Sequence, residues 1–479
     1  METVPERVRD RVGPGTALLA VSALALLARV WALGWRVAHQ DESRVAHWIL
    51  HYREFGVWEY RPIIHGPFLP HVNGVLFSFV PPSDFSMRLV VAVVGGLLPL
   101  VAWLFRERLR DAEVVALGLL LAANPILLYY SRFMRNDLLV AAFMLAALGL
   151  YVRAYDERDA RYLYAGTLPF ALAFTAKELA LVYPVSWAGA TLLLLDHRLV
   201  WATERDDWRG ELRDRVARAA VGVWRWRRAF ALAALEFLVV LVLFYAPKGT
   251  DPGLWSALAN PVALPGVVDE ALLGSWEKFT ETWGGAGGEP YMPYFFALGK
   301  VLVAGALALL AFAAAGFVAD RYSRNRDAVA FCGYWGVAHL FGIPVAIDNP
   351  FPWETIHVVV PLAVPAAVGV ALVYRLGRDA LADGDTAGAA AAAVLLLLAA
   401  GQVGAVAVDT SYVNPQSPDN DLVQFAQPAG EMQSTLERIY AVDRENGDAV
   451  DVLFYGEIKE TDSGRDRRDQ QAGDAGVRR

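Results

Sequence analysis

Four groups of ionisable side chains stand beside the ends of long apolar runs, where they could do chemistry. The first, His39-Gln40-Asp41-Glu42, directly follows the first apolar run. A carboxylate in a partly dry site can act as a general base, and a histidine near two carboxylates can bind a metal. His65 lies later in the same loop. The metal candidates are therefore His65 and Asp41, and whether the protein uses a metal is left open. The alternative for the acidic pair is a solvated helix end.

The second and third groups carry positive charge. Arg132 and Arg135 lie three residues apart in Ser131 to Asp137, and the planar guanidinium of arginine suits phosphate. The alternative is a short loop whose arginines extend to the membrane interface. Lys177 stands in a charged break between two apolar runs, where the alternative is a tight polar turn.

The fourth group combines two segments rich in proline and aromatic residues. The segment 289–294 contains Glu289 and Tyr291, and the segment 349–357 contains Glu354 and His357, which would share one helical face. Such segments also form the aromatic belt at the membrane interface, and this alternative stays open.

The elements that must position these groups are membrane-spanning helices. Hydrophobic residues make up 56% of the 479 residues and charged residues only 20%, and the apolar residues form runs of about 20, enough to cross a bilayer. We expect an all-α polytopic membrane protein of about eleven transmembrane helices, at residues 16–35, 86–105, 113–130, 137–153, 162–176, 179–196, 229–246, 294–319, 328–347, 356–374 and 388–408.

The distribution of basic residues predicts the orientation. With the N-terminus inside, the inner segments carry 23 Arg and Lys residues and the outer loops 9, as the positive-inside rule requires. The protein is therefore expected in the cell membrane as a multi-pass protein, with a cytoplasmic N-terminus and an extracytoplasmic C-terminus. All four ionisable groups then face outside.

The connecting segments carry further expectations. Residues 43–55 predict an amphipathic interfacial helix and 66–80 an interfacial or re-entrant segment. Residues 197–228 predict a surface helix that contacts anionic lipids.

We divide the chain into a transmembrane domain at 1–408, a small extracytoplasmic α/β segment at 409–460 and a disordered tail at 461–479. The α/β segment should contain a strand at 422–426, a helix at 429–446 and a strand at 450–455.

Several functional classes are excluded. The single cysteine, Cys332, rules out an intramolecular disulfide and a Cys-based metal site. The chain has no P-loop, Rossmann glycine fingerprint, HExxH or Gly-x-Ser-x-Gly motif. The net charge of −8 is mild, and we expect membrane lipids and no nucleic acid among the partners.

The acidic pair after the first span, the interfacial helix and the His-Gly-Pro turn resemble the membrane glycosyltransferases of GT-C fold. By pattern, the protein O-mannosyltransferases and aminoarabinose transferases are the most similar group, because the segments 130–137, 174–177 and 352–353 resemble theirs. The strings at 39–42 and 65–67 look like an archaeal family described as flippase-activity-associated in N-glycosylation. One departure is the lack of a lysine upstream of Pro352-Trp353.

This resemblance implies a polyprenyl (dolichyl)-phosphate-linked sugar donor and an inverting transfer at the outer face to a glycan, lipid or protein acceptor. Asp41 would be the general base, supported by Glu42, and Asp137 joins them as a catalytic candidate. His65 stands where relatives carry an acidic residue that binds phosphate or metal. Arg132, Arg135 and Lys177 would bind the donor phosphate. The full set of substrate-binding candidates is His39, His65, Arg132, Arg135, Lys177, Glu289, Tyr291, Glu354 and His357.

Two functional hypotheses follow. The first is a GT-C glycosyltransferase in a protein N-glycosylation or related glycan pathway, with a glycan ligase or polymerase as a variant that differs only in its acceptor. The second is a lipid-linked-sugar flippase, or a flippase-associated protein, without covalent chemistry. Transporters tend to place ionisable groups near the membrane midplane, so groups gathered at span ends favour the enzyme.

Overall fold

The protein is helical throughout the part that the structure describes. This structure, a computed structural model, describes residues 13–201, 208–284 and 287–446. Within them the β pairing is limited to one isolated bridge between Trp58 and Lys248. The chain divides into two compact units, Met1–Gln427 and Pro428–Arg479.

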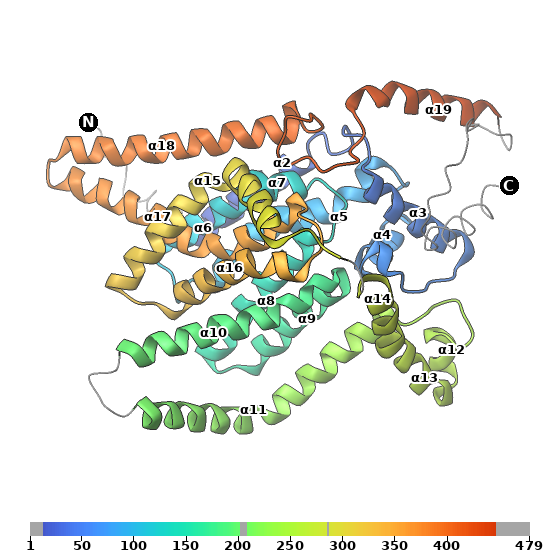
Figure 1. The fold of residues 1–479 in the computed structure, drawn as a ribbon, viewed down its shortest axis with the longest axis horizontal. Helices are drawn as coiled ribbons and strands as arrows, with labels where there is room; N and C mark the ends of the chain where they lie inside the picture. The colour runs from blue at the N-terminus through green and yellow to red at the C-terminus, as the bar shows by residue number, and fades with distance from the viewer. Residues whose placement is uncertain (1–12, 202–207, 285–286, 447–479) are drawn as a thin grey trace. The chain divides into compact units, whose positions relative to one another are not determined.

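Figure 1 shows the succession of helices along the chain. Their bounds are α2 (Pro14–Val30), α3 (Gln40–Phe55), α4 (Phe68–Leu76), α5 (Asp84–Leu97), α6 (Asp111–Ala123), α7 (Pro125–Tyr130), α8 (Asp137–Glu157), α9 (Ala160–Ala176), α10 (Val182–Trp201), α11 (Trp208–Tyr245), α12 (Leu254–Ala259), α13 (Leu264–Asp269), α14 (Ser275–Trp283), α15 (Tyr291–Ser323), α16 (Asp327–Ala346), α17 (Ile356–Ala382), α18 (Thr386–Val408) and, in the second unit, α19 (Gln433–Asn446).

Eight helical segments of the described residues are long and apolar enough to cross a membrane. They confirm an all-α polytopic membrane protein. Three other predicted spans are shorter helices: α2 and α9 have 17 residues each, and the span predicted at 113–130 is divided into α6 and α7. The division has a local cause, because Pro125 lacks a backbone N–H and the Asn124 side chain caps α7 through the Leu127 N–H at 3.2 Å.

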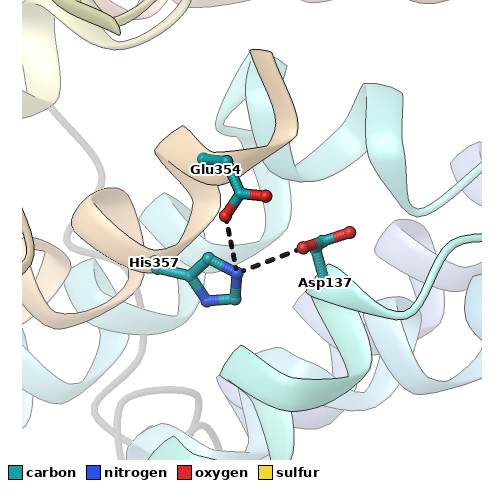
Figure 2. A group of neighbouring side chains, drawn as sticks. All are labelled: Asp137, Glu354 and His357. Atoms are coloured by element: carbon teal, nitrogen blue, oxygen red, sulfur yellow. Dashed lines mark hydrogen bonds and ion pairs between the residues drawn. The ribbon is translucent and has the colours of Figure 1, made fainter. Parts of the chain in front are cut away.

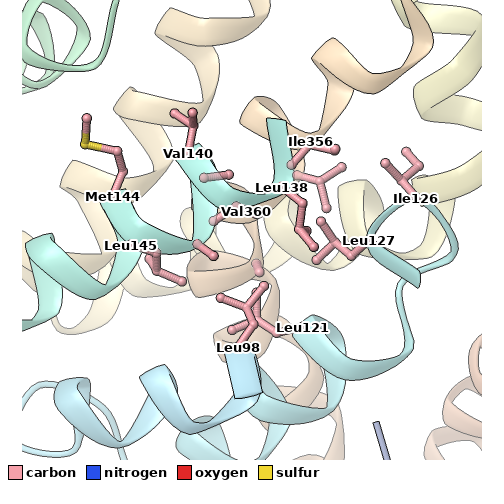
Figure 3. Packing of buried hydrophobic residues seen from close by; sticks show 14 of the residues in the cluster. Leu98, Leu121, Ile126, Leu127, Leu138, Val140, Met144, Leu145, Ile356 and Val360 are labelled. Atoms are coloured by element: carbon pink, nitrogen blue, oxygen red, sulfur yellow. The ribbon is translucent and has the colours of Figure 1, made fainter. Parts of the chain in front are cut away.

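The centre of the first unit is α17, which packs against α6, α15, α16 and α18. Its most apolar stretch is 83% buried, whereas the corresponding stretches of α11 and α18 are 6% buried. Figure 3 shows the packing around it, where Val360 of α17, Leu121 of α6 and Leu138 of α8 belong to one buried cluster. A helix that is apolar on all sides and enclosed by others is typical of a bundle core, and one exposed on most sides is suited to lipid contact.

The first long loop folds into two short helices. The amphipathic helix predicted at 43–55 is α3, whose Val45 and Ile49 are buried. Within 66–80 the chain forms α4, only nine residues long. Gly66 lies just before it, where a Cβ would stand 2.2 Å from the carbonyl oxygen of Thr175. Only glycine allows this approach, which holds the loop against the end of α9.

Two later expectations require correction. From Trp208 on, one continuous helix, α11, takes the place of two predicted elements. These are the surface helix at 197–228 and the span at 229–246. The strand predicted at 422–426 is absent, and turns take its place. The reason is that its backbone bonds to side chains: the Leu422 carbonyl accepts from the Tyr130 hydroxyl and the Leu422 N–H donates to Asn420.

The remaining C-terminal expectations have different outcomes. The helix predicted at 429–446 is α19, which follows a short turn of helix at Gly430–Met432. The strand predicted at 450–455 and the tail at 461–479 lie outside the described residues. The compact units divide after Gln427, so residues 409–427 belong with the helical bundle.

Candidate active site

A continuous chain of ionisable side chains lies where several helix ends meet. Each member is within 4.0 Å of the next by at least one pair of charged atoms. The members, in order of contact, are Asp41, Arg135, Asp137, Lys177, Glu354 and His357. We call this set the polar chain, and all six were candidates in the sequence.

Breaks between helices bring these side chains together. Asp137 is the first residue of α8, where the helix dipole favours a carboxylate. Lys177 follows the last residue of α9 in an extended conformation, with φ −156° and ψ 146°. Pro352 begins a turn of 3-10 helix, Pro352–Thr355, that carries Glu354 to the start of α17. The ends of α8, α9 and α17 therefore deliver charged groups to one place.

Lys177 is the centre of the buried part of the polar chain. Its ammonium donates to Asp137 at 2.6 Å and to Glu354 at 3.1 Å, and all three side chains are buried. Burial alone would lower the pKa of Lys177, but the two carboxylates raise it above its usual value. The ammonium is thus the cation that the two carboxylates share.

His357 closes the polar chain on the side of α10. Its Nε2 lies 3.3 Å from a carboxylate oxygen of Asp137 and 3.8 Å from one of Glu354, as Figure 2 shows. Its Nδ1 lies 2.6 Å from the Tyr183 hydroxyl, and the Nδ1 of His339 bonds to the His357 carbonyl at 2.8 Å. Both ring nitrogens are therefore engaged, which fixes the orientation of the imidazole.

The carboxylates of Asp137 and Glu354 also suit a metal ion. Asp137, Glu354 and His357 each offer one ligand atom, and these three atoms lie within 4.8 Å of one another. Two of the carboxylate oxygens, Oδ2 of Asp137 and Oε2 of Glu354, are buried without a hydrogen-bond partner. A divalent ion here would compete with the Lys177 ammonium for the same carboxylates. The metal pair expected from the sequence, His65 with Asp41, is not brought together.

Asp41 is the exposed end of the polar chain. Its carboxylate accepts a hydrogen bond from Arg135 at 2.6 Å, and Arg44 lies 3.9 Å away on its other side. A quarter of the Asp41 side chain remains exposed, whereas Asp137 and Glu354 are fully buried. The Arg135 guanidinium lies over the ring of Trp353, 3.5 Å from its centre, which holds it in place.

Glu42 has a different role from its neighbour Asp41. It is fully buried and accepts hydrogen bonds from Arg88 through two nitrogens at 2.8 Å each, from Arg36, and from the backbone N–H groups of His39 and Met134. Burial raises the pKa of this carboxyl, but Arg88 and Arg36 lower it by more than burial raises it, and the resulting pKa is about 2. Glu42 anchors α3 to α5 and to the loop at 131–136.

Arg132 and His39 also bind parts of the protein itself. Arg132 donates to four carbonyls at the end of α2, those of Ala28, Arg29, Trp31 and Ala32. His39 caps α3, because its Nδ1 accepts from the Asp41 N–H and its Nε2 bonds to the carbonyl of Phe425. His39 reaches the polar chain only at Asp41, where its Nδ1 lies 3.7 Å from a carboxylate oxygen. Within the described residues, Arg132 forms no ion pair with any member of the polar chain.

The remaining candidates lie elsewhere. His65 is 3.4 Å from Glu178, which also accepts from the Tyr60 hydroxyl, and it stacks on Trp283. Glu289 is exposed, and its backbone N–H donates to Asp348. The Tyr291 hydroxyl donates to the carbonyl of Phe341. Within the described residues, none of these three side chains forms an ion pair or hydrogen bond with Glu354 or His357.

Sequence reasoning missed several arginines of this region, among them Arg88 and Arg44. Arg88 lies inside a predicted span, and a charge in an apolar run was the available signal that it needs a buried partner. Arg44 is three residues after Asp41 on a predicted helix, so the spacing alone placed it on the same face.

The comparisons agree with this architecture. The family of dolichyl-phosphate-mannose-protein mannosyltransferases matches residues 64–207. A comparison with curated protein sequences gave no match. The structure is similar to that of ArnT from Cupriavidus metallidurans bound to undecaprenyl phosphate, with 18% sequence identity and a TM-score of 0.58, over 93% of this chain and 83% of that one.

A second similar structure is the archaeal oligosaccharyltransferase AglB from Archaeoglobus fulgidus, in complex with an inhibitory peptide and a dolichol-phosphate. The identity is 17% and the TM-score 0.51, over 86% of this chain but only 60% of that one. At these identities the likeness concerns the fold. The chain has a GT-C-like fold.

Proposed function

We propose that the protein transfers a sugar from a polyprenyl-phosphate-linked donor to an acceptor hydroxyl. The observation that carries the proposal is the position of Asp41, which is the partly exposed carboxylate at the end of a buried polar chain. The proposal is supported by the GT-C-like fold and by the mannosyltransferase family match at 64–207.

In the proposed reaction the acceptor oxygen attacks the anomeric carbon of the sugar. The bond between that carbon and the phosphate oxygen breaks, and polyprenyl phosphate leaves with the electron pair. Asp41 takes the hydroxyl proton as general base. A single displacement from the face opposite the leaving group inverts the anomeric centre.

The groups around Asp41 have separate roles. Arg135 and Arg44 flank it and would contact the donor phosphate, where positive charge stabilises the leaving group. Lys177 is held by Asp137 and Glu354, so we propose that it acts as a positioning residue and does not itself bind phosphate. Glu42 holds Asp41 in place through the start of α3.

The test uses membranes that contain the protein and donors with different sugars, and it measures release of polyprenyl phosphate together with labelled product. Asp41→Asn should reduce turnover by about 10²- to 10⁴-fold, the usual contribution of a general base. Glu54→Gln, which removes an exposed carboxylate of the same helix, is the matched control. Undiminished turnover in Asp41→Asn would reject the mechanism.

The finer assignment is to a protein N-glycosylation or related glycan pathway. It is supported by the resemblance of the strings at 39–42 and 65–67 to the archaeal flippase-associated family. The second candidate, a flippase without covalent chemistry, is separated by an assay in reconstituted vesicles. Movement of the lipid-linked sugar across the bilayer without glycosyl product would favour the flippase and reject the transferase.

A further inference from the structure

A polar cavity lies at the end of α2. Its volume is about 260 Å³. It is enclosed by the loop after α2, by α7 and by the π-helical turn Asp409–Val413 that ends α18. The polar side chains in its wall are those of Arg36, Tyr129, Arg132, Ser411, Tyr412 and Gln416.

The region around this cavity holds more buried positive than negative charge. Arg29, Arg36, Arg88 and Arg132 are all buried, and Glu42 is the carboxylate that pairs with Arg36 and Arg88. Within the described part of the chain, no carboxylate forms an ion pair with Arg29 or Arg132, which donate to backbone carbonyls. Buried charges in proteins are normally paired, so an excess of this kind calls for an anion.

Two donors at the cavity wall have no partner. Nε of Arg36 and Oγ of Ser411 are buried without a hydrogen bond, and their side chains belong to residues only 7% and 3% exposed. An unsatisfied buried donor costs free energy, more so when it is charged. A tetrahedral oxyanion in the cavity would offer acceptors to both, and arginine matches phosphate oxygens in geometry.

The surroundings indicate where such an anion comes from. Trp31 and Trp35 flank the cavity and are 69% and 76% exposed, which is typical of residues at the level of lipid headgroups. Leu24 and Leu27 of α2 are also exposed, so an apolar surface lies next to the cavity. A phosphate attached to a lipid could enter while its chains lie along this surface.

We infer that this cavity binds the phosphate group of an anionic membrane lipid, at a site separate from Asp41 and Arg135. Arg36 and Ser411 bind the phosphate directly, while Arg29 and Arg132 supply the field that attracts it. The inference does not depend on sugar transfer, because it concerns the charges and the unpartnered donors around the cavity.

Binding is tested on the purified full-length protein, without sugar donor, by native mass spectrometry and thermal unfolding. The probes are phosphatidic acid, diacylglycerol as the matched lipid without phosphate, and inorganic phosphate. Ser411→Asp places a carboxylate in the cavity and should abolish phosphatidic acid binding while the protein remains folded. Ser434→Asp, the same change at an exposed position of α19, should bind as the wild type does.

A second variant tests the charge directly. Arg36→Gln should weaken phosphatidic acid binding by about 10- to 100-fold, the effect of losing a hydrogen bond between charged groups. Equal retention of phosphatidic acid by wild type and Ser411→Asp, or equal retention of diacylglycerol, would overturn the inference. If inorganic phosphate stabilises the protein and phosphatidic acid does not, the cavity binds free phosphate. That result would overturn the inference that the phosphate belongs to a lipid.

Discussion

The Nη1 atom of Arg135 lies 2.6 Å from a carboxylate oxygen of Asp41, while its Nε lies 3.8 Å from Asp137. One guanidinium therefore joins the exposed carboxylate of the site to the buried ones. These contacts come from two different nitrogens of one planar guanidinium, and the compact ammonium of a lysine would not reproduce that geometry.

Arg135→Lys should therefore lower donor turnover by about 10- to 100-fold, the effect of losing one charge-assisted hydrogen bond. The measurement is the initial rate of polyprenyl phosphate release at saturating donor. Arg438→Lys, at an exposed position of α19, is the control and should not change the rate. Equal rates for Arg135→Lys and wild type would show that the link between the two carboxylates is not needed.

Lys177→Met should destabilise the protein by about 3–5 kcal/mol, because it leaves Asp137 and Glu354 buried without their cation. Unfolding in detergent measures the loss. Lys300→Met is the control, since Lys300 pairs with Asp421 at the surface and should cost less than about 1 kcal/mol. Adding Glu354→Gln to Lys177→Met should restore part of the stability, and no restoration would contradict the assignment of Lys177 as counter-ion.

The membership of the polar chain could be predicted from the sequence because of topology. Spans that alternate in direction bring every second connection to the same side, so charged residues at those span ends gather there. Asp41, Lys177 and His357 were candidates for this reason. The positions of these residues in the sequence did not predict which charges form pairs. Pairing depends on where each helix begins and ends, and local side-chain caps and prolines determine those ends.

Neighbouring residues show what the sequence could not provide. Asp41 and Glu42 are adjacent on α3, so their side chains point about 100° apart, one towards the exposed side and one into the core. Arg132 and Arg135 are three apart, but the chain between them is not helical, so they do not share a face. The phosphate-binding pair expected from spacing is therefore divided between the cavity and the polar chain.

Metal dependence is open to a direct experiment. We predict that turnover persists after treatment with EDTA, because the Lys177 ammonium already forms ion pairs with both Asp137 and Glu354. Loss of turnover with EDTA, and its recovery with one divalent ion, would instead identify Asp137, Glu354 and His357 as ligands. His357→Ala should then weaken that recovery, while His47→Ala, a change in α3 outside the polar chain, should not.

The orientation in the membrane can be tested with single cysteines. Cys332 is the one native cysteine and is buried, so an introduced thiol can be labelled selectively. We predict that a membrane-impermeant thiol reagent labels Glu54→Cys on intact cells, because the basic segments place α3 outside. Asp383→Cys, beyond the far end of α17, should be labelled only after lysis. The reverse pattern would place the site on the cytoplasmic side.

The pH dependence of stability should report the anchoring of Glu42. The pKa of this carboxyl is lowered from 4.5 to about 2 in the folded protein, so folding favours the ionised form. Its contribution is therefore complete above pH 4.5 and is lost as the pH falls towards 2. A shift of this size corresponds to about 3 kcal/mol.

Glu42→Gln should be less stable than the wild type by about this amount at pH 6, and the difference should shrink as the pH falls from 4.5 towards 2. Other carboxylates titrate in the same range, so the informative quantity is the difference between the two proteins at each pH. Glu54→Gln provides the control, because that side chain is exposed and its replacement should leave the curve close to that of the wild type. A constant difference between Glu42→Gln and wild type across this range would mean that the Arg88 and Arg36 pairs do not stabilise the charge on Glu42.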